Sequence, residues 1–106
     1  FPTYVTYSTG SGTGPYSLAA VDLNGDGKSD IIVGNLLGNG INVFLNSGTG
    51  TFPTMSAYYT GSSIFGVAVG DINTDGRMDI TVPNYSTNNV GILLNSGSGT
   101  FPTITT

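Results

Sequence analysis

Short apolar runs alternate along the chain with clusters of glycine, serine, threonine and asparagine. In the first half, the runs predict β-strands at Ser17–Val21, Ile31–Gly34, Ile41–Asn46 and Phe52–Tyr59. The polar clusters between them have the composition of tight turns. No stretch has the period and length of an amphipathic helix. The pattern therefore predicts an all-β protein.

The same pattern occurs twice. The segment 45–54 recurs almost unchanged as 94–103, and the offset of 49 residues also relates Asp22 to Asp71. A repeat of about 50 residues with four strands is typical of an antiparallel propeller blade. The second set of predicted strands is Gly66–Gly70, Ile80–Pro83, Val90–Asn95 and a shortened Phe101–Thr106.

Two four-stranded blades are thus predicted, in residues 11–59 and 60–106, with residues 1–10 as an additional outer strand that closes a blade. Propeller rings have about four to eight blades, so two blades leave the ring open. Either the chain is a fragment of a longer propeller, or identical chains close a ring through head-to-tail contacts. We favour a homo-oligomer of three copies, with four copies as the alternative.

The additional strand suggests how such a ring would close. Phe1–Ser8 is a third copy of the fourth strand, and Phe101–Thr106 begins the same strand and stops early. We expect Phe1–Ser8 to pair with the exposed edge of a neighbouring second blade, which would displace the C-terminal copy. In the alternative, Phe101–Thr106 completes its own blade.

Every charged side chain lies in one of two segments, 22–30 and 71–79. The chain has six acidic residues, all of them aspartates, and two cations, for a net charge of −4. Two cations cannot supply the phosphate contacts that nucleic-acid binding needs. No apolar run approaches the roughly 20 residues of a membrane helix, so we expect no membrane insertion. The sequence has no cysteine and no histidine, which excludes thiolate chemistry and the usual general base.

Both charged segments have the pattern Asp-x-Asn-x-Asp-Gly-x-x-Asp. Three carboxylates in nine residues repel one another, and a hard dication bound by oxygen atoms offsets that repulsion. Glycine at position 6 permits the sharp turn around an ion, and position 7 contributes its backbone carbonyl. Position 12, where an EF-hand has glutamate, is Val33 or Val82 in a predicted strand, so the loop is not an EF-hand.

The alternative is that Asp26-Gly27 and Asp75-Gly76 are simple hairpin turns. That alternative leaves the flanking carboxylates at positions 1 and 9 unexplained in both copies. Zinc is disfavoured because histidine and cysteine are absent. Magnesium is an alternative, but a cage made entirely of protein oxygens suits calcium better. We therefore predict two calcium ions per chain, held by Asp22, Asn24, Asp26, Asp30 and the Lys28 carbonyl, and by Asp71, Asn73, Asp75, Asp79 and the Arg77 carbonyl.

At these loops the sequence resembles the FG-GAP/VCBS repeat of integrin α-subunit heads and of many secreted lectins and adhesins. The aspartate pattern followed by an apolar strand, the pair Phe65-Gly66 and the element Asn-Ser-Gly-x-Gly-Thr-Phe carry the resemblance. It implies a β-propeller, commonly of seven blades, with the calcium ligands named above. It also implies an extracellular or cell-surface setting, with a lectin-like or adhesive role.

A second candidate site lies in the polar loop that begins at Asn84. Tyr85 has Leu36 as its counterpart in the first repeat and could stack on a sugar, with Asn84, Asn88 and Asn89 as hydrogen-bonding partners. The alternative is a polar loop without a ligand. The matched aromatics Tyr16 and Phe65 are expected in the core. Because every carboxylate belongs to the predicted calcium loops, we expect no enzymatic activity; the candidates are a glycan-binding module and a purely structural one.

Overall fold

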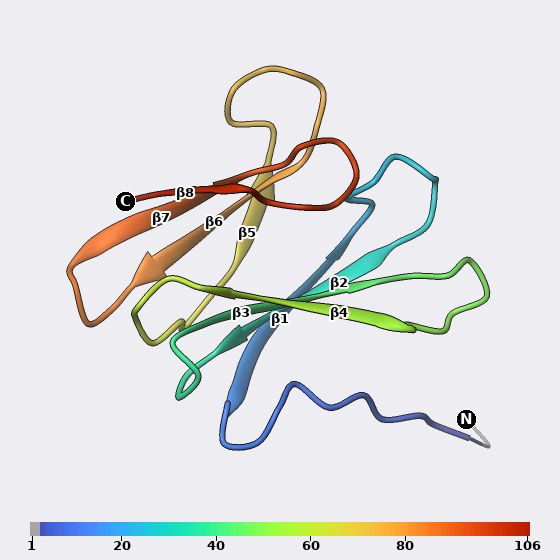
Figure 1. Ribbon diagram of the computed structural model, residues 1–106, viewed down its shortest axis with the longest axis horizontal. Coiled ribbons are helices and arrows are strands. Elements are labelled where there is room, and N and C mark those ends of the chain that lie inside the picture. The colour runs from blue at the N-terminus through green and yellow to red at the C-terminus, as the bar shows by residue number, and fades with distance from the viewer. Residues whose placement is uncertain (1–2) are drawn as a thin grey trace.

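The computed structural model describes residues 3–106 and contains two separate antiparallel sheets of four strands each (Figure 1). Both sheets are simple meanders in which each strand pairs with the next along the chain. The two-blade, all-β prediction is confirmed. The first sheet comprises β1 (Pro15–Val21), β2 (Asp30–Asn35), β3 (Gly40–Leu45) and β4 (Thr54–Tyr59); the second comprises β5 (Ala68–Gly70), β6 (Asp79–Asn84), β7 (Asn89–Leu94) and β8 (Thr103–Thr105).

The meander topology places the two kinds of glycine-rich loop at the same end of each sheet. Consecutive strands are antiparallel, so β1 and β3 run in the same direction and end on the same side. The aspartate loop 22–29 follows β1, and the loop 46–53 follows β3. The loops 71–78 and 95–102 are related in the same way in the second sheet. Each predicted calcium loop therefore has a glycine-rich neighbour.

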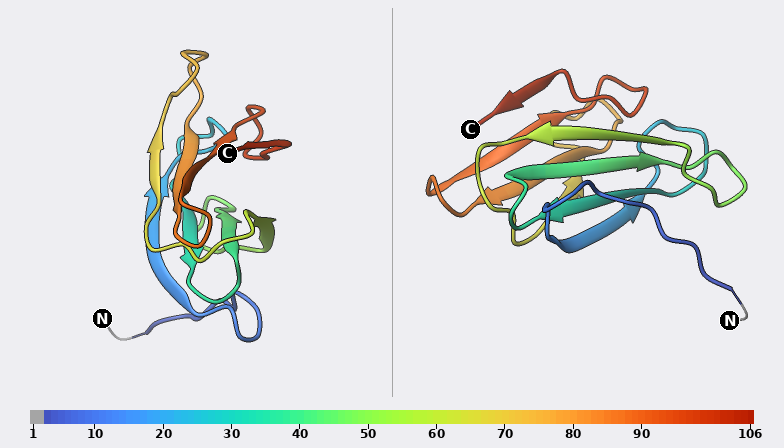
Figure 2. Two further views of the ribbon diagram at one scale, coloured as in Figure 1. Left: turned by 90° about the vertical axis from the view of Figure 1, so that its left-hand side faces the viewer. Right: turned by 60° about the horizontal axis from the view of Figure 1, so that its bottom comes forward.

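The hydrophobic core lies between the two sheets, whose faces pack against each other (Figure 2). The blades approach closely at Gly34, where a Cβ atom would lie 2.8 Å from Ile64, a residue that bridges to Asn84 of the second sheet. Neither sheet has a second partner within the described residues. The buried cluster consists of Leu23, Ile32, Ile41, Val43, Ile64, Ile80, Val82, Leu93 and Phe101.

The structure corrects the expectation about the aromatics and shows how the C-terminus is paired within one chain. Residues 103–105 pair with β7, so in the single chain the C-terminal copy completes its own blade, and its displacement by a neighbouring copy stays a prediction. Residues 3–8 form no strand, and Phe1 and Pro2 lie outside the described residues. Tyr16 and Phe65 are not core residues: both are exposed, and their rings meet edge to face at 5.5 Å. They border a sheet face that no further blade covers.

Candidate metal centre

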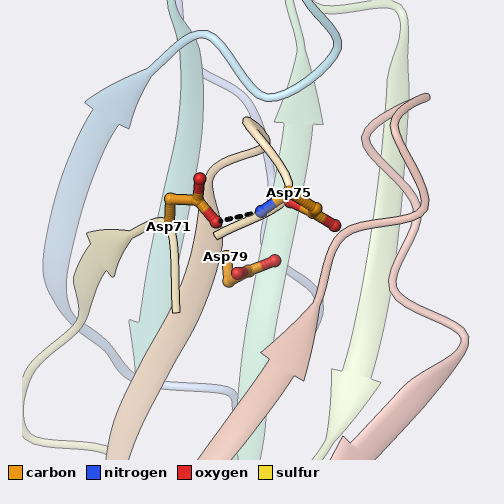
Figure 3. Close-up of side chains that lie close together, drawn as sticks. All are labelled: Asp71, Asp75 and Asp79. Atoms are coloured by element: carbon orange, nitrogen blue, oxygen red, sulfur yellow. Dashed lines mark hydrogen bonds between the residues drawn. The ribbon is translucent and has the colours of Figure 1, made fainter. Parts of the chain in front are cut away.

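Three aspartates converge in the loop between β5 and β6 (Figure 3). Carboxylate oxygens of Asp71, Asp75 and Asp79 lie within 4.8 Å of one another. One cation, the Arg77 guanidinium, approaches Asp75 at 3.7 Å from the exposed side. In the part of the chain that the structure describes, this is the one trio of acidic side chains that converges in this way. Its ligand atoms are all hard oxygens, as a calcium ion requires.

The first aspartate of each loop organises the turn around it. In the second loop, Asp71 accepts hydrogen bonds from the amides of Asp75 at 3.0 Å and Gly76 at 2.7 Å. Asp22 accepts from the amides of residues 24, 25, 26 and 27 at 2.8–3.3 Å. The Gly27 amide contributes most to lowering the pKa of Asp22, and the other three amides add to it against the opposing effect of burial. Asp22 therefore stays ionised at neutral pH, as a metal ligand must.

The last aspartate of each loop is fully buried and ties the loop to two strands. Asp79 accepts the Ile72 amide at 2.9 Å and the Asn95 amide at 2.8 Å, one on each oxygen. Asp30 accepts the amides of Leu23 and Asn46 in the same way, both at 2.8 Å. Each carboxylate oxygen has a second lone pair, so these bonds leave acceptor capacity for an ion. Positions 1 and 9 thus have structural roles that a simple Asp-Gly turn does not require.

Asn24 lies between two carboxylates of the first loop. Its side-chain nitrogen donates to Asp22 at 3.1 Å and to Asp26 at 2.9 Å, so the amide bridges positions 1 and 5 of the loop. The carboxylate, amide and backbone oxygens that the loop offers are a donor set that fits calcium. Asn73, the counterpart in the second loop, is exposed.

Backbone geometry supports the role assigned to position 6. Gly27 and Gly76 have φ of 81° and 84°, a region that favours glycine. Position 4 also has positive φ, which the sequence pattern did not indicate: Gly25 has φ 76°, but its counterpart is Thr74 with φ 58°. A β-branched residue in this region is strained. The conformation of the second loop therefore includes backbone strain at Thr74.

Sequence reasoning missed Asn46 and Asn95, which connect each aspartate loop to its glycine-rich neighbour. Besides bonding the buried aspartate through its amide, Asn95 donates from its side chain to the carbonyls of Met78 at 2.8 Å and Leu23 at 2.6 Å. Its side-chain oxygen accepts the amides of Gly97 and Gly99, so its bonding capacity is full. The signal was present in the sequence, because asparagine recurs at the matched positions.

The position 7 side chains also reach the neighbouring loop. A Cβ atom at Gly48 would lie 2.5 Å from Lys28 Cε, and one at Gly97 would lie 2.8 Å from Arg77 Nε. The side chains of Lys28 and Arg77 therefore lie against these glycines. The backbone amide of each donates a hydrogen bond to the aspartate at position 5 of its own loop, at 2.9 Å in both loops.

The four candidate sugar-binding residues come together at the other end of the second sheet. An open pocket of about 410 Å³ is lined by Asn84, Tyr85, Asn88 and Asn89 with Phe65, Pro83 and Val90. Tyr85 is exposed, and its ring lies 4.9 Å from that of Phe65. Asn84 is buried and donates to Asn89 at 2.9 Å, so its amide stabilises the hairpin. Tyr85, Asn88 and Asn89 provide the accessible part of the pocket.

Meandering four-stranded sheets stacked face to face, each with an aspartate loop at one end, define a β-propeller-type module. Residues 22–82 match the FG-GAP-like repeat, and the chain belongs to this family. The match includes both aspartate loops. No curated protein and no solved structure matches the chain significantly. Within residues 3–106 we find no helix of the length and apolar character needed to cross a membrane.

Proposed function

We propose that this chain is a calcium-binding propeller module in which each aspartate loop holds one ion. The convergence of three carboxylates within 4.8 Å in the second loop carries the proposal. An ion there offsets the repulsion among them and fixes position 79, to which the amides of Ile72 and Asn95 are bonded. Calcium would therefore stabilise the blade by joining its loop to β6 and β7.

An extracellular setting is part of this proposal, because FG-GAP-like modules commonly work there and calcium is abundant outside cells. Extracellular calcium modules bind with dissociation constants of about 10⁻⁴–10⁻³ M. Isothermal titration calorimetry on chelator-treated protein tests both points. We expect two ions per chain with affinity in that range. No binding at millimolar calcium would refute the proposal, and nanomolar affinity would argue against the extracellular setting.

Glycan binding is a second candidate, favoured by the pocket that Tyr85, Asn88 and Asn89 line. The exposed Tyr85 ring could stack on a sugar face while the two amides bond its hydroxyl groups. A glycan array with the native chain and its Tyr85→Ala variant tests this role, with Ser98→Ala in the exposed loop at the other end of the second sheet as the control. Binding that is lost in the first variant and kept in the second is expected. Absence of binding to any glycan leaves calcium-dependent structure as the function.

A further inference from the structure

The two sheets leave two outward faces. The leading face is the side of the second sheet directed away from the first, and it carries Ile72, Pro83 and Val90. The trailing face is the opposite side of the first sheet and carries Leu18, Val33 and Phe44. By the repeat, the leading face corresponds to the side of the first sheet that packs on the second. The trailing face corresponds to the side of the second sheet that packs on the first. The buried contact between the blades therefore shows what kind of surface each outward face fits.

Residues of the leading face are exposed where their counterparts are buried. Val90 is 55% exposed, whereas Ile41, its equivalent, is 1% exposed between the blades. Ile72 is 50% exposed, whereas Leu23 is 3% exposed under the second blade. Large apolar side chains in these positions lack the cover that the repeat provides elsewhere.

The trailing face shows the complementary difference. Leu18 is 69% exposed, whereas its equivalent Val67 packs on Gly34. A Cβ atom at Gly50 would meet nothing within 4 Å, whereas one at Gly99 would meet Leu45 at 3.0 Å across the blade contact. Both outward faces therefore have the composition of the contact that the chain already makes with itself.

The polar part of the template is matched as well. Asn95 donates to Leu23 across the blades. Asn46, the equivalent residue, accepts the same two loop amides as Asn95 does, but its side chain donates only to the Ser29 carbonyl. One N–H of that side chain is therefore without a partner in the described residues. The equivalent of Leu23 is Ile72, on the leading face. One backbone bond between the blades could not form between copies. The Ile64 amide donates to the Asn35 carbonyl, whereas Pro15, the equivalent of Ile64, has no N–H to donate.

The N-terminal segment already occupies the place of a preceding blade's outer strand. Tyr7 meets Phe52 edge to face at 5.5 Å, and its hydroxyl accepts the Phe52 amide at 3.3 Å. Tyr58 of β4 meets Phe101 with the same two distances. β8 pairs with residues 92–94 of β7, and the repeat aligns residues 6–8 of a following copy with residues 89–91 of the same strand.

We propose that the leading face of one chain binds the trailing face of a second copy, head to tail, and that repetition of this contact closes a ring. Three copies would supply six blades. The candidate glycan pocket lies on the leading face. Its equivalent in the first blade is filled by residues 60–64, which bond the carbonyls of Asn35 and Asn39. Residues 9–15 of the next copy would fill the pocket in the same way, so ring closure and glycan binding exclude each other.

Two single variants test the contact by sedimentation equilibrium at about 100 µM chain in calcium. Leu18→Asp blocks only the trailing face, and Val90→Asp blocks only the leading face, since both side chains are exposed in the single chain. We expect the native chain at three times its 10.8 kDa and each variant at 10.8 kDa. An equimolar mixture of the variants should form a one-to-one dimer and nothing larger, because one intact face of each kind remains. Ser98→Asp, in the exposed loop at the opposite end of the second sheet from the pocket, is the control and should leave the oligomer unchanged.

Several results would overturn the proposal. A monomeric native chain would do so, as would an oligomer that persists in either blocked variant or a mixture that stays monomeric. Binding of a glycan to the intact oligomer would show that the pocket is not filled by a neighbour. Circular dichroism checks that each variant is folded. Calcium stoichiometry is measured separately on the monomeric variants, so a failure of the contact is distinguishable from a failure of the calcium proposal.

Discussion

Replacing Asp79 with asparagine separates the two roles that the structure gives this residue. The carboxylate is fully buried and accepts one backbone amide on each oxygen, from Ile72 and Asn95. Asparagine keeps one acceptor but turns an NH₂ group toward the other amide. The variant therefore loses a hydrogen bond to a charged group and leaves a buried donor unsatisfied.

The size of the effect follows from these two losses. The lost bond to a charged group contributes about 1.5–3 kcal/mol and the unsatisfied donor about 1–3 kcal/mol, so the free energy of unfolding should fall by about 2.5–6 kcal/mol even without calcium. In a domain of this size 1 kcal/mol corresponds to about 4–8 °C, so even the lower end of that range should lower the melting temperature by about 10–20 °C. Calcium at 100 times the dissociation constant adds about 2.7 kcal/mol per site to the native chain, and the variant should lose most of that gain at one site.

Asp75→Asn is the matched control, because it removes the same charge from the same loop. Asp75 is exposed and holds no strand; it accepts only the nearby Arg77 amide. We expect this variant to melt like the native chain in excess chelator and to gain less from calcium. Thermal melts by circular dichroism, with and without chelator, compare the three proteins. If Asp79→Asn melts like the native chain in chelator, the buried carboxylate does not join the strands. If Asp75→Asn binds two ions with unchanged affinity, the ligand assignment is wrong.

Three further pairs of variants test other features. Thr74→Gly should raise the melting temperature by relieving about 1 kcal/mol of strain at φ 58°, whereas Gly25→Thr should lower it; equal shifts in both would contradict the strain argument. Asn95→Ala should destabilise the chain by about 2–4 kcal/mol in urea unfolding, and Asn46→Ala by less, because of these two asparagines only Asn95 donates a hydrogen bond across the blades. Gly34→Ala should cost about 1–3 kcal/mol through overpacking against Ser17 and Ile64, while Gly66→Ala, with nothing within 4 Å, should melt within a few degrees of the native chain; a tolerated Gly34→Ala would show that the blades do not pack this closely.

The strands were predictable because the same hydrophobic pattern occurs in both repeats, so each predicted strand is supported by its counterpart 49 residues away. All eight observed strands overlap their predictions, and the differences lie at the ends. β5 begins at Ala68 rather than Gly66. β2 and β6 begin one residue earlier than predicted, at the aspartates whose carboxylates bond neighbouring loops.

Contacts between segments distant in sequence were beyond the pattern. The spacing indicated aspartates at positions 1 and 9, but the amides that reach Asp30 and Asp79 come from loops that only the meander brings together. The exposure of Tyr16 depends likewise on which faces have a neighbouring blade. Local turn chemistry is written in consecutive residues, whereas solvent exposure is set by the surroundings of the whole sheet.

The bond from Asn95 to the Leu23 carbonyl joins the second blade to the loop that would hold the first ion. Asn24, a predicted ligand in that loop, also lies beside Gly99 of the second blade. An ion that orders the first loop would therefore also order the surface against which the second blade packs. Packing of the second blade would in turn restrain the residues that bind the ion. By thermodynamic reciprocity each event must strengthen the other by the same factor. Ion binding at one loop would then favour ion binding in the neighbouring blades, and the affinity for the ion would rise with the number of packed blades.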